Sequence, residues 1–91
     1  MKDDNIKDIA RKFIIDNYLL GSSKAIIGDD DSFLEKGIVD SIGIIELTSF
    51  LQRRFNVSIR PVEIVPENLD SLRNIDRFVT KKLAAKSGRR P

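Results

Sequence analysis

A loop rich in apolar residues runs into a predicted helix along Gly37-Ile38-Val39-Asp40-Ser41-Ile42-Gly43-Ile44-Ile45-Glu46-Leu47. Asp40 and Ser41 both carry a short side-chain oxygen that can accept a hydrogen bond from a free backbone N–H group in the first turn of a helix. One of the two is therefore expected to cap the helix, which leaves the other side chain free. Because no proline follows before Phe55, the helix is predicted to extend from Ser41 to Phe55.

The predicted helix 41–55 has apolar residues on two of its faces. At about 100° per residue, one face collects the residues that are predicted to be buried: Ile44, Leu47, Thr48, Leu51 and Phe55. Ile42 and Ile45 fall on a different side, beside Ser41, Glu46 and Ser49. A serine that follows an aspartate at a helix start is usually a structural cap. That role does not account for two isoleucines that the core does not need.

The composition narrows the classes of protein to consider. A chain of 91 residues makes one small domain; we expect it over residues 1–85, with a basic, disordered tail over 86–91. The absence of cysteine and histidine removes disulfides, thiolate zinc sites and the commonest general base, so ordinary hydrolase chemistry is not expected. No apolar run has the length of a signal peptide or a membrane span, so a cytoplasmic protein without membrane contact is expected.

The net charge of +2 hides an uneven distribution of charged residues. The region before and around Ser41 is acidic, through Asp29, Asp30, Asp31, Glu35, Asp40 and Glu46. The C-terminal end is basic, through Lys81, Lys82, Lys86, Arg89 and Arg90. Lysine and arginine side chains are favoured at the solvated C-terminal end of a helix, where the helix dipole is negative. Nucleic-acid binding is not expected, because the chain has no tryptophan and no recognised motif for it.

The first part of the chain predicts an amphipathic helix followed by a long loop. Asn5, or one of the two aspartates before it, can cap a helix that continues to Tyr18 or Leu19 and stops at Gly21. Residues 22–40 are too apolar for a loop that stays in water. We therefore expect this loop to fold back over the bundle and to deliver the chain to Ser41.

The segment after the second predicted helix contains a connector and two more helices. Asn56 is placed for a left-handed cap, and residues 57–60 are interpreted as an extended connector pinned to the core. A short helix is expected at residues 66–69, where a proline suits the first turn, and the last helix starts at Leu72. The predicted fold class is all-α: a four-helix bundle with three longer helices, one short helix and a long first loop.

The step Asp70-Ser71-Leu72 repeats the pattern of Asp40-Ser41-Ile42. Only the earlier step follows a long apolar loop and has an unneeded apolar pair beside it. We therefore expect Asp70 or Ser71 to cap the last helix, and we interpret Ser71 as a structural residue.

The run from Gly37 to Gly43, followed by Ile45-Glu46-Leu47, resembles the attachment motif of the acyl carrier protein and peptidyl carrier protein family, which binds phosphopantetheine. The similarity continues in order and spacing through Phe33-Leu34-Glu35, Phe55-Asn56-Val57-Ser58-Ile59 and Glu67-Asn68-Leu69-Asp70-Ser71-Leu72 with Ile75. It covers residues 6–83 and implies the four-helix bundle of acyl carrier proteins. The Gly-Ile-Val-Asp-Ser form is similar to that of stand-alone carriers of specialised pathways, including polyketide and nonribosomal-peptide clusters and D-alanyl carriers.

This resemblance implies a carrier protein that performs no catalysis itself. Ser41 would carry a 4′-phosphopantetheine arm, transferred from coenzyme A by a phosphopantetheinyl transferase that recognises Asp40. The arm would hold acyl or aminoacyl groups as thioesters for a fatty-acid, polyketide or related pathway. The implied partners are acyl-activating, condensing or acyltransferase enzymes, and the carrier is expected to be a monomer. The implied docking residues are Ile42, Ile45, Glu46, Ser49 and Ile59.

The helix 41–55 also departs from the pattern of fatty-acid carriers. Many of these carriers keep acidic residues after the motif serine and along the later turns, where this chain has Gly43, Gln52, Arg53 and Arg54. This departure counts against a role with general fatty-acid synthase enzymes, while the fatty-acid, polyketide and related pathways all stay open. Two other hypotheses remain open. One is a small helical interaction domain in which Ser41 is only a cap; the other is a nucleic-acid accessory domain that uses the basic residues.

Overall fold

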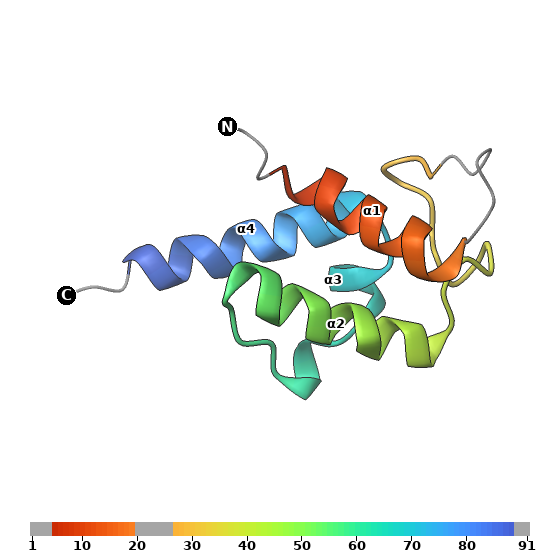
Figure 1. The fold of residues 1–91 in the computed structure, drawn as a ribbon. Coiled ribbons are helices and arrows are strands. Elements are labelled where there is room, and N and C mark those ends of the chain that lie inside the picture. The colour runs from red at the N-terminus through yellow and green to blue at the C-terminus, as the bar shows by residue number, and fades with distance from the viewer. Residues whose placement is uncertain (1–4, 20–26, 89–91) are drawn as a thin grey trace.

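The computed structural model describes residues 5–19 and 27–88, and this part of the chain contains helices and no strands. The elements are α1 (Ile6–Tyr18), α2 (Ser41–Phe55), the 3₁₀ helix η1 (Pro61–Glu63), α3 (Pro66–Leu69) and α4 (Leu72–Gly88) (Figure 1). Each of the other three α-helices contacts α4, and α1 also contacts α2. The prediction of an all-α bundle with three longer helices and one short helix is confirmed.

The ends of the helices follow from residues that the sequence singles out. The Asn5 side chain accepts a hydrogen bond from the Asp8 N–H at 3.1 Å, so Asn5 caps α1. Asn56 ends α2 in the left-handed conformation, with φ of 55° and ψ of 51°. Ser71 Oγ accepts a hydrogen bond from the Asn74 N–H at 3.1 Å, which satisfies a free donor in the first turn of α4. Ser71 is thus a structural cap, as predicted.

One face of each helix and part of the long loop build the core. Its fully buried side chains are Ala10, Ile14, Phe33, Leu47, Leu51, Leu69, Leu72, Ile75 and Val79. Thr48 is buried as well, and its hydroxyl donates to the Ile44 carbonyl at 2.8 Å, so no polar group is stranded there. The predicted buried face of α2 is confirmed except at Phe55, which is only partly buried.

The long loop is tied to the junction between α3 and α4 through Asp70. The Phe33 N–H donates to the Asp70 carbonyl at 3.0 Å, and the Leu34 N–H donates to Asp70 Oδ1 at 2.9 Å. The Ser32 hydroxyl donates to the other carboxylate oxygen of Asp70. Phe33 is fully buried, so its ring adds a hydrophobic anchor at the same place. The prediction that the loop folds back over the bundle is therefore confirmed for the residues from 27 onward, whereas Gly21 and the rest of 20–26 lie outside the described residues.

Acidic residues of the loop make a second set of ties, to α1 and α4. The Arg73 guanidinium bonds both carboxylate oxygens of Asp30, at 2.6 and 3.1 Å. Lys7 and Arg11 of α1 donate to Asp29 at 3.0 and 2.9 Å. The hydrogen bond from Arg73 is the main reason why the pKa of Asp30 lies below its usual range. These carboxylates are therefore partly committed to internal pairs.

Two features of the second half of the chain differ from the sequence-based description. The 3₁₀ helix η1 was not predicted; Pro61 suits its first position, and Glu63 stabilises it by accepting from the Arg60 N–H at 2.9 Å. The helix α4 continues to Gly88, into the segment 86–91 that the sequence sets apart as a tail. Lys86 donates to the carbonyl of Asn56 and so ties the last turns of α4 to the end of α2.

Candidate functional site

The first turn of α2 resolves which of the two candidate side chains caps the helix. Asp40 Oδ1 accepts a hydrogen bond from the Gly43 N–H at 2.8 Å, and the Asp40 carbonyl accepts from the Ile44 N–H at 2.9 Å. Ser41, the first residue of α2, is exposed. Within residues 5–19 and 27–88, no group forms a hydrogen bond with the Ser41 hydroxyl. Asp40 is thus the cap, and the serine hydroxyl is left for another partner.

Gly43 allows the loop and α1 to approach this first turn closely. It is buried, and a Cβ atom at this position would lie 2.4 Å from Val39 Cγ1 and 3.2 Å from ring atoms of Tyr18. These distances are shorter than normal contacts, so a larger residue would force Val39 away. In the sequence, Gly43 stood out only as a departure from fatty-acid carriers. A glycine in an otherwise strong helical pattern is the signal that could have indicated close packing.

We predict that Gly43→Ala destabilises the fold even though alanine is the better helix former. Overpacking costs about 1–3 kcal/mol, whereas the gain in helix propensity is about 1 kcal/mol. Because the added Cβ atom would lie only 2.4 Å from Val39 Cγ1, the cost should be in the upper part of this range, and the free energy of unfolding in urea should fall by about 1–2 kcal/mol. The exposed Ser49→Ala variant of the same helix should stay within about 0.5 kcal/mol of the original protein. Equal or greater stability of Gly43→Ala would show that Val39 is not held against α2.

Tyr18, at the end of α1, forms a hydrogen bond across the site. Its hydroxyl donates to Glu46 Oε1, one turn along α2 from Ile42. The ring is half-buried and packs edge-on against Phe13, with 6.2 Å between ring centroids and 68° between planes. Burial, then the hydrogen bond and charge of Glu46, and finally the charge of Asp40, raise the pKa of Tyr18 to about 12. Both carboxylates thus favour the neutral phenol in the folded protein.

The Tyr18 phenol should titrate near pH 12 in the folded protein and near pH 10 in urea. Because the folded pKa is the higher one, the stabilising contribution is complete below pH 10 and is lost as the pH rises toward 12. Tyr18 is the single tyrosine and there is no tryptophan, so the ultraviolet absorbance of phenolate reports this residue alone. Glu46→Gln should shift the midpoint down while burial keeps it above the ordinary value. A folded-state midpoint near 10, with circular dichroism showing intact helices, would contradict the contact.

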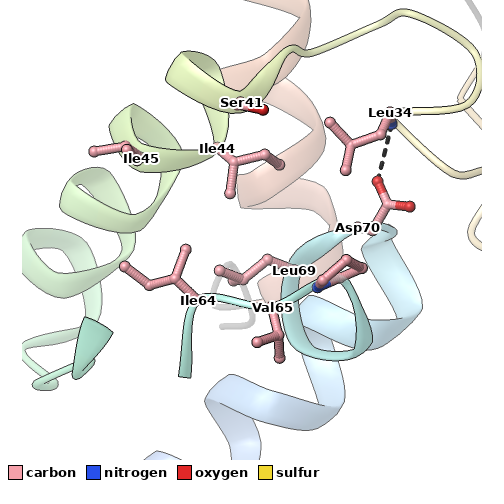
Figure 2. Close-up of a pocket in the computed structure, with 9 residues that line it drawn as sticks. Leu34, Ser41, Ile44, Ile45, Ile64, Val65, Leu69 and Asp70 are labelled. Atoms are coloured by element: carbon pink, nitrogen blue, oxygen red, sulfur yellow. Dashed lines mark hydrogen bonds between the residues drawn. The ribbon is translucent and has the colours of Figure 1, made fainter. Parts of the chain in front are cut away.

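A pocket of about 330 Å³ opens between α2 and the segment that contains α3 (Figure 2). It is lined by Leu34, Ser41, Ile44, Ile45, Ile64, Val65, Pro66, Leu69 and Asp70. Most of these side chains are apolar, and the Ser41 hydroxyl and the Asp70 carboxylate are the polar side-chain groups among them. Asp70 Oδ1 is already engaged by the Leu34 N–H, as Figure 2 shows. The pocket therefore offers an apolar wall directly beside the free hydroxyl.

The residues expected to form a docking surface do not all lie at the surface. Ile42 is 66% exposed and Ile45 is 56% exposed, and Glu46 and Ser49 are exposed beside them. Ile59 does not belong with this set. It is 6% exposed, because its side chain packs into the core from the connector after α2, so the expectation that it contacts partners is wrong.

One exposed apolar residue, Val62 in η1, was not predicted to belong to the site. Val62 is 69% exposed, and Ile64, two residues later, lines the same pocket as Ile45. A valine between two prolines, in a segment too short for a core-facing helix, was the available signal.

Within the described residues, no group of three or more acidic side chains is arranged to hold a metal ion. The described helices include none that is long and apolar enough to cross a membrane.

Comparison with known proteins decides the family. Residues 19–79 match the profile of the family described as "Phosphopantetheine attachment site". The chain belongs to this family. It is therefore a carrier and not an enzyme, its prosthetic group is covalent 4′-phosphopantetheine, and it acts with partner enzymes. A related protein, the D-alanyl carrier protein of Abiotrophia defectiva, is 29% identical over 56 residues, which covers 62% of this chain and 71% of the relative.

Proposed function

We propose that Ser41 is the residue to which the phosphopantetheine arm of this carrier is attached. The single observation that supports this most strongly is the division of roles at the start of α2, where Asp40 caps the helix and the exposed Ser41 hydroxyl has no partner among residues 5–19 and 27–88. If Ser41 were only a cap, its oxygen would be expected to accept from the first turn. The interaction-domain hypothesis loses its main argument here.

The start of α2 also suits the phosphate through which the arm would be joined. The N–H groups of Ser41 and Ile42 donate to no acceptor in the described part of the chain, and they lie at the N-terminus of a helix of 15 residues. Such N–H groups and the helix dipole both favour an anion. The negative carboxylate of Asp40 would repel a phosphate, so Asp40 does not help to bind it. We assign Asp40 instead to capping and to recognition by the transferase.

We further propose an aminoacyl group of about the size of alanine as the cargo, with a short acyl group as the second candidate. When bound, the arm supplies the thiol on which the cargo is held as a thioester. The pocket beside Ser41 has a volume of about 330 Å³, near the lower end of ligand pockets. The similarity to a D-alanyl carrier protein favours the aminoacyl class, whereas the apolar lining of the pocket is the feature that favours an acyl group.

The proposed docking surface consists of exposed apolar residues near Ser41 in the sequence or in the pocket's neighbouring segment: Ile45, which lines the pocket, Ile42 next to Ser41, and Val62, two residues before the pocket residue Ile64. Glu46 and Ser49 lie beside them on α2. Exposed apolar side chains that cluster near a site indicate contact with a partner. Three such residues make a small contact, which suits a carrier that must leave one enzyme for the next. The phosphopantetheinyl transferase and an enzyme that activates the cargo are the proposed partners; a condensing enzyme or an acyltransferase would apply only to acyl cargo.

Attachment at Ser41 is tested by incubating the purified chain with coenzyme A, magnesium and a broad-specificity phosphopantetheinyl transferase. Intact-protein mass spectrometry should show the addition of one phosphopantetheine, and Ser41→Ala should abolish it. Ser71→Ala is the matched control, because Ser71 also follows an aspartate but is 6% exposed and caps α4. This variant should still be loaded, with a loss of stability of about 1 kcal/mol. An unmodified Ser41 in folded protein would refute the proposal.

The cargo is identified on carrier purified from its own cell. Treatment with hydroxylamine should release a small aminoacyl hydroxamate from wild-type protein and nothing from Ser41→Ala. Mass spectrometry of the released compound distinguishes an alanine-sized group from a short acyl group. Release of a long acyl group instead would contradict the proposed aminoacyl cargo.

A further inference from the structure

Tyr18 connects the end of α1 with the exposed face of α2, across 28 positions of sequence. Its ring is held from two sides, by the edge-on contact with Phe13 and by the close approach to Gly43. The position of the hydroxyl is therefore fixed by packing. Since this hydroxyl donates to Glu46 Oε1, the carboxylate of an exposed residue is held in one orientation.

Glu46 retains capacity for a further contact. It makes no ion pair with a lysine or arginine of the described residues, and its second oxygen, Oε2, accepts no hydrogen bond there. It is also the one acidic residue of the α2 sequence, whose later turns carry Arg53 and Arg54. An ionised carboxylate can accept several hydrogen bonds, including those of an arginine. The negative charge on this face of α2 is thus concentrated at one fixed position, beside Ile42 and Ile45.

We propose that Tyr18 is a positioning residue that holds Glu46 ready to accept an arginine or lysine side chain of the transferase that loads Ser41. The proposal rests on the proposed function of Ser41. The partner surface that fits would cover Ile42 and Ile45 with apolar residues and place one cation against Glu46. A glutamate that is free to rotate loses side-chain entropy when it is bound, whereas one that is already oriented loses less. Tyr18 thereby strengthens the encounter without touching the partner.

Kinetics of phosphopantetheine transfer test this role directly. In the assay with coenzyme A and the broad-specificity transferase, Glu46→Gln should raise KM about fivefold and leave kcat unchanged, because an exposed charge contact is lost. Tyr18→Phe keeps the ring and removes only the hydroxyl; it should raise KM about twofold. The double variant should match Glu46→Gln alone, since Tyr18 acts only through the glutamate charge. Added salt should raise the wild-type KM and affect the Glu46→Gln variant less.

Two controls separate positioning from general effects on charge or folding. Asp8→Asn removes one negative charge at the opposite end of α1, and its KM should equal that of the wild type. Thermal unfolding of Tyr18→Phe shows whether this variant keeps its fold. Glu46→Gln changes the other partner of the same hydrogen bond, so it tests the contact without altering the tyrosine. A wild-type KM for Tyr18→Phe, or losses that multiply in the double variant, would overturn the proposal. Failure of the wild-type chain to be loaded at all would instead refute the function proposed for Ser41.

Discussion

The hydrogen bonds between Asp70 and the turn at residues 32–34 fix the path of the chain into α2. The carbonyl of Phe33 accepts from the N–H groups of Ile38 and Val39, at 2.8 and 3.4 Å, so the same turn directs the chain back toward the bundle. Val39 then packs against Gly43, which places the Asp40 side chain over the first turn of the helix. Presentation of Ser41 thus depends on a carboxylate near the start of α4. Hydrogen bonds to a charged group contribute about 1.5–3 kcal/mol each, enough to hold a loop in a small domain.

The same anchor also shapes the pocket beside Ser41. Leu34 and Asp70 both line it, and the hydrogen bond between them sets the distance between the loop and α3. Leu34 is 40% exposed, so it forms part of the rim while Phe33 next to it is buried in the core. A change in the loop would therefore alter both the position of the hydroxyl and the width of the apolar wall. The same contacts between the loop and Asp70 therefore position both the Ser41 hydroxyl and the pocket beside it.

Local patterns in the sequence predicted the elements but not the contacts that fix them in space. The bounds of α2 followed from its two polar residues at the start and from the absence of proline, because these determinants lie within the helix itself. The choice between Asp40 and Ser41 as cap stayed open, since both side chains have the same local chemistry and the packing of Val39 against Gly43 decides between them. Ile59 was expected both to pin the connector to the core and to lie on the docking surface; its burial agrees with the first role and leaves almost no exposed area for the second. The contact from Tyr18 joins distant positions and has no periodic signature.

The sequence shows an acidic region before and around Ser41, but the structure shows that part of this charge is used within the molecule. Asp29 and Asp30 pair with Lys7, Arg11 and Arg73, so these loop carboxylates stabilise the loop against α1 and α4. Pairing with cations nearby largely cancels their field at a distance of about one Debye length, near 8–10 Å. The negative charge left for a partner on α2 then resides mainly in Glu46, while its exposed isoleucines supply apolar area. Recognition of this carrier should consequently depend on apolar contact and on the charges of Asp40 and Glu46 near Ser41, rather than on a broad acidic surface.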